Sequence, residues 1–278
     1  MIHHRHIDLA EPAHQGTQQE TDQLPTQGRV TYQEAGEGPA VVFLHGIGAG
    51  ASTFALQLEA FAAAGYRAIA WDMPGYGGSS PLPLVTIDAL VATLGAFLRQ
   101  FERPVLVGHS MGGMLILRLL ALAPHAARAV VLSQTSAAFG AKDPAWATQF
   151  VQSRLAPLDA GHSMADLAGN MVNGMVGDDP DPAGTALAWA GIAATPNATF
   201  RDTVLALPGF DQRDTLATIV VPTLVLAGSR DTNAPAPGME RMAARIPGAR
   251  YVCIEGAGHL VHLEQPGAFN SAVMEFLA

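Results

Sequence analysis

The strongest chemical signal in the sequence is a serine flanked by glycines, in the segment Gly108–Gly113 (GHSMGG). The apolar run Pro104–Val107 before it predicts a buried strand, and the apolar run Met114–Leu120 after it predicts a largely buried helix. A serine on a tight turn between a strand and a helix has an exposed hydroxyl. Glycines permit such a strained turn because they lack a Cβ atom. We therefore expect Ser110 to act as a nucleophile.

A serine nucleophile needs a neighbouring base, usually histidine, and a carboxylate that orients the imidazole. Among ten histidines, His259 is favoured because it lies just past the last predicted strand, in a loop of small residues. Asp231 follows the predicted strand 223–227 and reaches the same edge of the sheet, although an Asx-turn would also explain an aspartate there. Asp72, which also ends a strand, is expected to fix a turn, and Glu255 is a weaker rival for the acid.

Three other histidines lie close to these segments in the sequence. His109 is adjacent to Ser110, so its side chain is expected to point elsewhere. His45 stands at a strand end, where it could support the following loop, and it is also a candidate for the substrate pocket. His262 is expected on a helix face.

The elements that position these residues alternate between strands and helices over most of the chain. Predicted strands cover residues 29–34, 40–44, 67–71, 104–107, 129–132, 223–227 and 249–254. Predicted helices cover residues 54–63, 86–101, 114–120, 239–246 and 268–277, and Thr86 is a candidate N-cap. This alternation predicts an α/β fold with a mostly parallel central sheet and helices on both faces.

Two segments depart from this alternation. Residues 1–24 are polar, and we expect a flexible tail with a weak edge strand near Leu24. The four histidines of this tail could bind a metal, but nothing fixes their geometry, so a solvated tail is favoured and no metal is predicted. Residues 137–214 hold helical patterns broken by Gly and Pro. They predict a helical cap inserted into a core made of residues 25–136 and 215–278.

Composition excludes several classes of protein. The chain has 278 residues and is 49% apolar, which suffices for a sizeable core. Its net charge of −9 argues against a nucleic-acid partner. The single cysteine, Cys253, cannot form an intrachain disulfide, and the longest apolar run is too short to span a bilayer. We expect a cytoplasmic protein without a membrane partner, and the sequence leaves a homo-oligomer open.

Five motifs occur in the order typical of the α/β-hydrolase family, which the chain resembles over residues 24–278. The resemblance implies that Ser110 is the nucleophile, His259 the base and Asp231 the acid. It also implies an oxyanion hole formed by the backbone N–H groups of Ile47 and Met111, and no cofactor. The motifs are His45-Gly46, Asp72-x-Pro74-Gly75-x-Gly77-x-Ser79, Gly108–Gly113, Gly228-x-x-Asp231 and Gly258-His259.

Within this family, two stretches resemble the 3-oxoadipate enol-lactonases: His45–Gly48, and His259–Pro266 followed by Phe269-Asn270. This resemblance implies a small carboxylic ester or lactone as the substrate, cleaved through an acyl-enzyme. Related esterases share the same residues, so the ester and the lactone both remain open.

Other members of the family provide the alternatives. Carbon–carbon bond hydrolases of aromatic ring-cleavage products use the same triad, but they commonly carry Gly-Pro-Gly where this chain has Gly48-Ala49-Gly50. Cofactor-free perhydrolases and slow-turnover small-molecule receptors also remain open. Epoxide hydrolases and haloalkane dehalogenases are disfavoured because they place Asp at the position of Ser110.

The substrate pocket is expected between Ser110 and the cap. Arg154 and Arg201 could each pair with a substrate carboxylate, although a solvated surface position would explain either arginine. The candidate pocket residues are His45, Trp146, Phe150, Arg154, Met171, Met175, Trp189 and Leu260.

Overall fold

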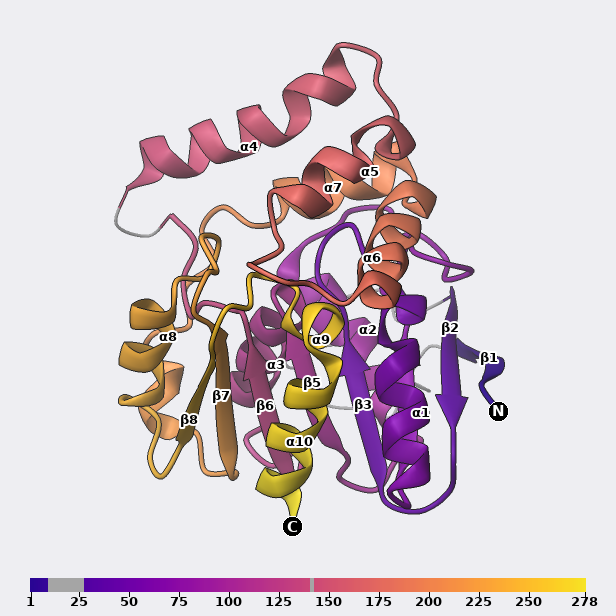
Figure 1. Cartoon of the computed structure of the whole chain (residues 1–278), viewed down its shortest axis with the longest axis vertical. Helices are drawn as coiled ribbons and strands as arrows, with labels where there is room; N and C mark the ends of the chain where they lie inside the picture. Colours follow the sequence, from indigo (N-terminus) through magenta and orange to yellow (C-terminus); the bar gives the residue numbers. More distant parts are fainter. Residues whose placement is uncertain (10–27, 141–142) are drawn as a thin grey trace, which may run out of the picture.

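The computed structural model describes residues 1–9, 28–140 and 143–278, and its centre is one eight-stranded sheet (Figure 1). The strands are, in chain order, β1 (His3–Leu9), β2 (Gly28–Ala35), β3 (Ala40–Leu44), β4 (Arg67–Trp71), β5 (Val105–His109), β6 (Ala129–Ser133), β7 (Thr223–Gly228) and β8 (Arg250–Ile254). Their order across the sheet is β1-β2-β4-β3-β5-β6-β7-β8. Strands β3 to β8 are parallel, whereas β1 and β2 are antiparallel at one edge.

Helices cover both faces of the sheet, which is why the central strands are apolar along their whole length. One face packs against α1 (Ala55–Ala63) and α10 (Pro266–Leu277), which follows the short α9 (Val261–Glu264). The other face packs against α2 (Ile87–Leu98), α3 (Met111–Leu122) and α8 (Ala236–Ala243). The described residues also include the short 3₁₀ helices η2 (Ala51–Phe54) and η3 (Thr215–Thr218).

Four helices between β6 and β7 form an inserted cap: α4 (Pro144–Asp159), α5 (Met164–Asn173), α6 (Pro182–Ala194) and α7 (Asn197–Leu205). Figure 1 shows α4 standing beyond the edge at which the parallel strands end. The sequence marks the helix starts, because the side chains of Asp143, Ser163 and Asp181 accept N-cap hydrogen bonds at the first turns of α4, α5 and α6. The cap has its own apolar cluster, which includes Phe200 and Ile192.

The predicted α/β fold with an inserted helical cap is confirmed. Each of the seven strands predicted between residues 29 and 254 is present, and Thr86 caps α2 by accepting a hydrogen bond of 3.1 Å from the N–H of Ala89. Several helix ends differ from prediction. Helix α3 begins at Met111, directly after Ser110, and α2 ends at Leu98, three residues before the predicted end. Helix α8 covers Ala236–Ala243 instead of the predicted residues 239–246.

The prediction of a flexible tail is wrong for its first part. His3–Leu9 form strand β1, which pairs with β2 along its whole length. An edge strand gains its stability from backbone hydrogen bonds and needs little apolar surface, so this polar segment lacked the usual pattern. Only Ile7 and Leu9 pack against the core. The predicted edge strand near Leu24 lies outside the described residues.

The turn that carries Ser110 depends on glycines because helix α3 runs directly over the end of the sheet. A Cβ atom added to Gly108 would lie 2.6 Å from the backbone of Gly112 and Gly113. A Cβ atom added to Gly112 would overlap the carbonyl of Leu44 on strand β3. The two glycines therefore let helix α3 lie closer to strands β3 and β5 than any other residue type would allow.

We expect Gly112→Ala to lower the free energy of unfolding by about 2 kcal/mol or more, because the methyl group would force β3 and α3 apart. Gly95→Ala is the matched control, since Gly95 lies inside helix α2 with no heavy atom within 4 Å of an added Cβ. That substitution should raise stability by about 0.5–1 kcal/mol. Urea unfolding measures both, and equal stability of the two variants would contradict this packing argument.

Candidate active site

Ser110 sits in a strained backbone conformation at the junction of β5 and α3, with φ 51° and ψ −116°. Positive φ is costly for a residue with a side chain, so the surroundings must hold it. The Ser110 N–H donates to the carbonyl of Ser133 at 2.9 Å, and the Thr135 hydroxyl donates to the Ser110 carbonyl at 2.7 Å. Strand β6 and the residues after it thus fix the turn and leave the Ser110 hydroxyl facing the cap.

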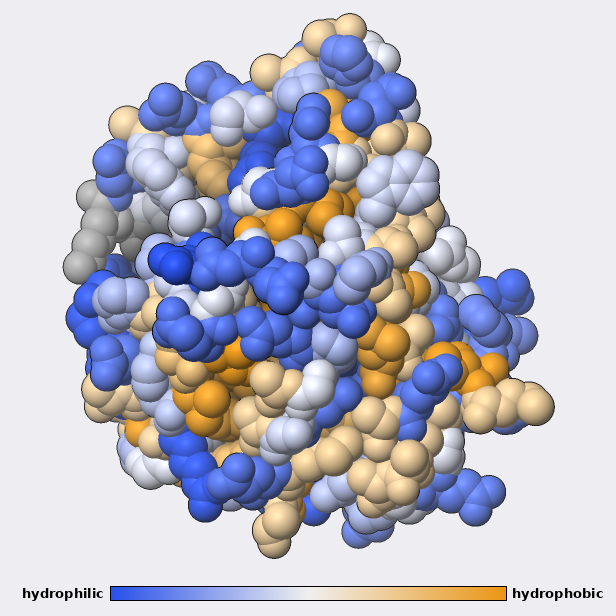
Figure 2. Space-filling view, in the orientation of Figure 1, coloured by the Kyte–Doolittle hydropathy of each residue, from blue (hydrophilic) through white to orange (hydrophobic). Residues whose placement is uncertain are grey.

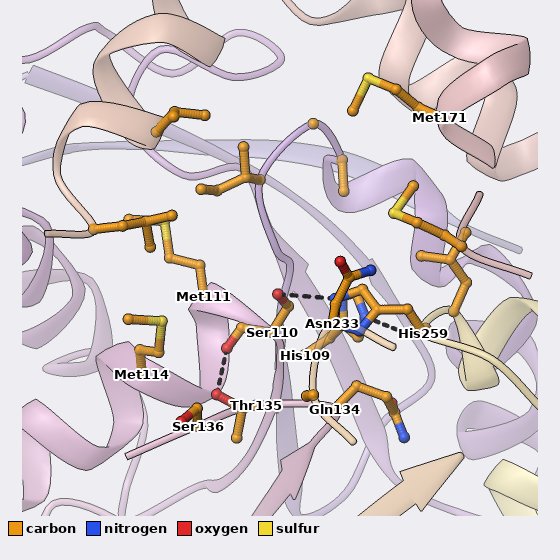
Figure 3. A pocket seen from close by; sticks show the side chains of 18 of the residues that line it. His109, Ser110, Met111, Met114, Gln134, Thr135, Ser136, Met171, Asn233 and His259 are labelled. Carbon is orange, nitrogen blue, oxygen red and sulfur yellow. Dashed lines mark hydrogen bonds between the residues drawn. The ribbon is translucent and has the colours of Figure 1, made fainter. Parts of the chain in front are cut away.

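Three side chains from different strand ends form one chain of hydrogen bonds. His259 Nε2 lies 3.1 Å from Ser110 Oγ (Figure 3). His259 Nδ1 lies 2.8 Å from Asp231 Oδ2. Asp231 Oδ1 also accepts from the N–H groups of Asn233 and Ala234, at 2.7 and 3.0 Å. Burial works to raise the pKa of Asp231, but the hydrogen bond and charge of His259 together with these N–H groups hold it below its usual value.

The loop that carries His259 is held by a buried carboxylate, Glu264, on the short helix α9. Its Oε1 accepts from the N–H of Leu260 at 2.7 Å, and its Oε2 accepts from Gly258 at 2.8 Å. The same Oε2 accepts from Gly177 of the cap at 2.6 Å. The His259 N–H in turn donates to the carbonyl of Met175 in the cap at 2.7 Å. The histidine loop and the α5–α6 connection therefore form one unit.

His45 lies beneath the loop that follows β3 and holds it in place through hydrogen bonds. Its Nε2 accepts from the N–H of Met73 at 2.9 Å, and its Nδ1 lies 2.8 Å from the carbonyl of Gly46. His45 therefore supports the loop, as one interpretation of the sequence expected, but it is buried beneath the loop and does not line the cavity. The prediction that His45 lines the pocket is wrong, because both of its ring nitrogens are hydrogen-bonded to backbone groups.

Two backbone N–H groups next to Ser110 are free to bind an anion. Ile47 and Met111 both line the cavity beside the serine. Within residues 28–140 and 143–278, neither N–H donates a hydrogen bond. Met111 is the first residue of helix α3, where an N–H has no partner within the helix. Figure 3 shows Ser110 between Met111 and His259.

A cavity of about 380 Å³ opens over the Ser110 hydroxyl, between the sheet and the cap. Figure 2 shows hydrophobic side chains beneath helix α4, where the surface is hollowed. Six of the predicted pocket residues line this cavity: Trp146, Phe150, Arg154, Met171, Met175 and Leu260. Trp189 does not, because its helix α6 turns that side chain to solvent, and it is 50% exposed. Arg201 lies outside as well, in an ion pair with Asp159.

Several cavity residues were not among the sequence candidates. Cap helices present different faces to the cavity, and their register relative to the sheet depends on contacts far apart in the chain. The only local signal was a cluster of aromatic residues near the start of α4. Phe139 packs against Trp146 in a tilted arrangement and edge-to-face against Phe150, with ring centres 5.2 and 5.1 Å apart. The residues missed include Met114, Phe139, Ile192, Phe200, Leu207 and Asn233.

The histidines that neighbour His259 are buried at the base of the site. His109 Nε2 lies 2.8 Å from the His259 carbonyl, so its side chain points away from the serine but toward the histidine loop. His262 lies on helix α9, as expected, and its side chain is buried and stacks on Phe54 with ring centres 4.7 Å apart. Burial, and then His259, lowers the pKa of His109 to about 3. Burial, and then His109 and His259, lowers the pKa of His262 well below its usual value.

A mostly parallel sheet with a Ser–His–Asp hydrogen-bond chain at its strand ends and a helical cap above is the architecture of the α/β hydrolases. The sequence agrees with this classification. Residues 41–272 match the model of the alpha/beta hydrolase family, and the chain belongs to that family.

Three curated relatives are similar in sequence. The chain is 31% identical to part of polyketide synthase ThaQ of Burkholderia thailandensis, with 98% of the chain covered but only 13% of that protein's length. It is 31% identical to a Mycobacterium tuberculosis protein that carries the name non-heme bromoperoxidase BpoC, covering 90% of this chain and 97% of that one. It is 29% identical to a pimeloyl-[acyl-carrier protein] methyl ester esterase of Xanthomonas campestris, covering 87% and 96%.

Solved structures share the fold. A hydrolase from Pseudomonas aeruginosa superposes with a TM-score of 0.79 at 28% identity, covering 91% of this chain and 95% of that one. The enol-lactonase from Burkholderia xenovorans superposes with a TM-score of 0.75 at 24% identity, covering 90% and 96%. This second likeness establishes the fold alone.

Neither a metal-binding cluster nor a membrane-spanning helix occurs in the described part of the chain. Residues 1–9, 28–140 and 143–278 contain no group of three His, Cys, Asp or Glu side chains arranged to hold a metal ion. His14 of the polar tail lies outside this range. In the same residues, every helix is too short or too polar to cross a membrane.

We expect Glu264→Gln to lower the free energy of unfolding by about 1–3 kcal/mol, because the amide group cannot accept all three N–H groups that the carboxylate accepts. Reaction rates at saturating substrate should fall more than substrate affinity, since the His259 loop is displaced rather than the cavity wall. Glu255→Gln is the matched control, because that side chain has the same charge, lies in the same loop and is exposed. Urea unfolding and steady-state kinetics measure both, and identical behaviour of the two variants would exclude the bracing role of Glu264.

A second prediction concerns acid sensitivity. His262 is neutral when folded, whereas the unfolded chain binds its proton below a pKa near 6.5. The stability that depends on neutral His262 is therefore complete above that pH and falls as the pH drops below it, by about 1.4 kcal/mol per pH unit. His262→Phe keeps the stacking on Phe54 and removes the titration, so the variant should lose less stability than the wild type between pH 8 and pH 5. Urea unfolding at both pH values tests this, and parallel losses would argue against a buried neutral imidazole.

Proposed function

We propose that the protein is a serine hydrolase that cleaves a small carboxylic ester or lactone through an acyl-enzyme on Ser110. The observation that carries the proposal is the hydrogen-bond chain from Ser110 Oγ through His259 to Asp231, at 3.1 and 2.8 Å, which opens onto a cavity of about 380 Å³. Cavities of about this size hold small molecules.

The reaction follows from this geometry. Ser110 Oγ attacks the carbonyl carbon while His259 Nε2 accepts the hydroxyl proton. Asp231 accepts the hydrogen bond from Nδ1 and stabilises the imidazolium that forms. The N–H groups of Ile47 and Met111 donate to the oxyanion, and each such donor typically contributes a few kcal/mol to the transition state. His259 then protonates the alcohol as it leaves, and water, activated by the same histidine, releases the acid.

The cavity supports a substrate with an apolar acyl or alkyl part. Most of its lining is carbon, from methionine, leucine, isoleucine and aromatic side chains. Helices α4 to α7 act in this proposal as the cap that selects the substrate. The methyl ester esterase among the relatives acts, by its name, on a methyl ester, which agrees with ester chemistry at this site. The enol-lactonase resemblance of His45–Gly48 and His259–Pro266 keeps a lactone within the same proposal.

Transfer of the acyl group to hydrogen peroxide is a second candidate activity with specific support. The relative named as a bromoperoxidase, at 31% identity over nearly its whole length, favours peroxide as an alternative acceptor of the acyl group. In that reaction hydrogen peroxide replaces water in the second step and the product is a peracid. Release of peracid from an ester in the presence of hydrogen peroxide separates the two activities. Many turnovers of a 4-nitrophenyl ester would exclude a receptor that is acylated once.

We expect Ser110→Ala to abolish both ester turnover and covalent labelling by a serine-directed phosphonate. Ser136→Ala is the matched control, because Ser136 also lines the cavity but donates its hydroxyl to the carbonyl of Ala138 at 2.9 Å. That variant should keep turnover and labelling. Mass spectrometry of the labelled protein measures the result, and labelling that persists in Ser110→Ala would remove Ser110 from the mechanism.

A further inference from the structure

Arg154 is the one permanently charged side chain on the wall of the cavity over Ser110, within the described part of the chain. It comes from the middle of cap helix α4 and is half-buried there. The described lining contains no aspartate or glutamate. In a protein with a net charge of −9, the cavity thus presents one isolated positive charge within an otherwise mostly apolar wall.

The position of Arg154 is set by two neutral partners. Its Cζ atom lies 5.0 Å from the ring centre of Phe150, so the guanidinium stacks on an aromatic wall that continues to Phe139 and Trp146. Its Nη2 lies 3.4 Å from Asn233 Oδ1, a long hydrogen bond to an uncharged group. Neither contact neutralises the charge, and burial lowers the pKa of Arg154.

Seven other arginines in the described part of the chain pair with a carboxylate, and the remaining six, such as Arg128 and Arg250, are exposed to solvent. Arg201 pairs with Asp159, and Arg230 pairs with Asp178 at 2.9 Å. Arg154 has no carboxylate partner among residues 1–9, 28–140 and 143–278. A solvated surface position would explain a missing partner, but it does not explain a guanidinium held against Phe150 on the cavity wall.

Asn233 connects this charge to the hydrogen-bond chain of the site. Its backbone N–H donates to Asp231 Oδ1 at 2.7 Å, and its side chain accepts from Arg154. Figure 3 shows Asn233 beside His259. An anion bound to Arg154 would therefore lie in the same cavity as the ester under attack, and the amide of Asn233 could donate a second hydrogen bond to it.

We propose that Arg154 and Asn233 bind a carboxylate of the substrate, so that the enzyme prefers esters or lactones that carry a second, ionised carboxyl group on the acyl part. This inference rests on the proposed function and specifies its substrate class. A planar guanidinium binds a carboxylate through two parallel hydrogen bonds, which lysine cannot do, and a half-buried site excludes much of the competing water. The ionised group stays unchanged during the reaction and serves only to hold and orient the ester.

The test compares two probes that differ in one charge: mono-4-nitrophenyl glutarate, and the methyl 4-nitrophenyl diester of glutaric acid, at pH 8. The ratio of their kcat/KM values measures preference for the carboxylate. We expect the wild type to favour the charged probe, and Arg154→Met to lower the ratio at least about 10-fold, chiefly through KM of the charged probe. Arg154→Lys should restore only part of the ratio. Arg201→Gln, which removes a cap arginine outside the cavity, should leave the ratio unchanged.

Measurements of binding alone distinguish a failure of the carboxylate site from a failure of ester hydrolysis. Isothermal titration calorimetry with the same two probes in the Ser110→Ala background measures recognition without chemistry. Tighter binding of the charged probe that is lost in Ser110→Ala/Arg154→Met supports the carboxylate site, even if the wild type hydrolyses neither ester, in which case the proposed function alone fails. Equal binding of both probes, or a preference that survives removal of Arg154, overturns the inference.

Discussion

The site depends on the close contact between the end of the parallel sheet and the first turn of helix α3. Ser110 adopts a positive φ there, and the conformation is held because Gly108 and Gly112 let the helix lie against β3 and β5. That contact has two consequences at once. It lifts the Ser110 hydroxyl out of the sheet, and it leaves the N–H of Met111 without a partner beside that hydroxyl. The proposed nucleophile and half of the proposed oxyanion site thus share one structural cause.

The histidine reaches the serine through a second contact, which links the core to the cap. Glu264 accepts hydrogen bonds from N–H groups on both sides of His259 and from Gly177 of the cap, so one buried carboxylate holds the His259 loop and the cap together. A Cβ atom on Gly177 or Gly184 would overlap backbone carbonyls of the histidine loop and of α9. The α5–α6 side of the cap is therefore attached firmly to the site, whereas α4, with Arg154, forms the opposite wall of the cavity.

The features that the sequence predicted well are those encoded over short distances. The strand–turn–helix around Ser110 and the loops that carry Asp231 and His259 each fit within about ten residues, and the order of these segments places them at one sheet edge. Features that depend on distant contacts were not predictable. Glu264, His109 and His262 are bonded or packed across the fold, and nothing near them in the sequence indicates burial. Strand β1 was missed for a related reason, because its backbone pairs with β2 while its side chains remain mostly exposed.

In the proposed mechanism, Ser110 attacks a carbonyl carbon, and the N–H groups of Ile47 and Met111 then hold the carbonyl oxygen. A crystal structure of the protein after reaction with methyl 4-nitrophenyl hexylphosphonate tests it most directly, because the tetrahedral phosphonate resembles the intermediate of ester hydrolysis. We expect phosphorus bonded to Ser110 Oγ and the phosphonyl oxygen about 2.7–3.1 Å from both backbone nitrogens. Phosphorus on any other side chain, or a phosphonyl oxygen directed away from both N–H groups, would contradict it.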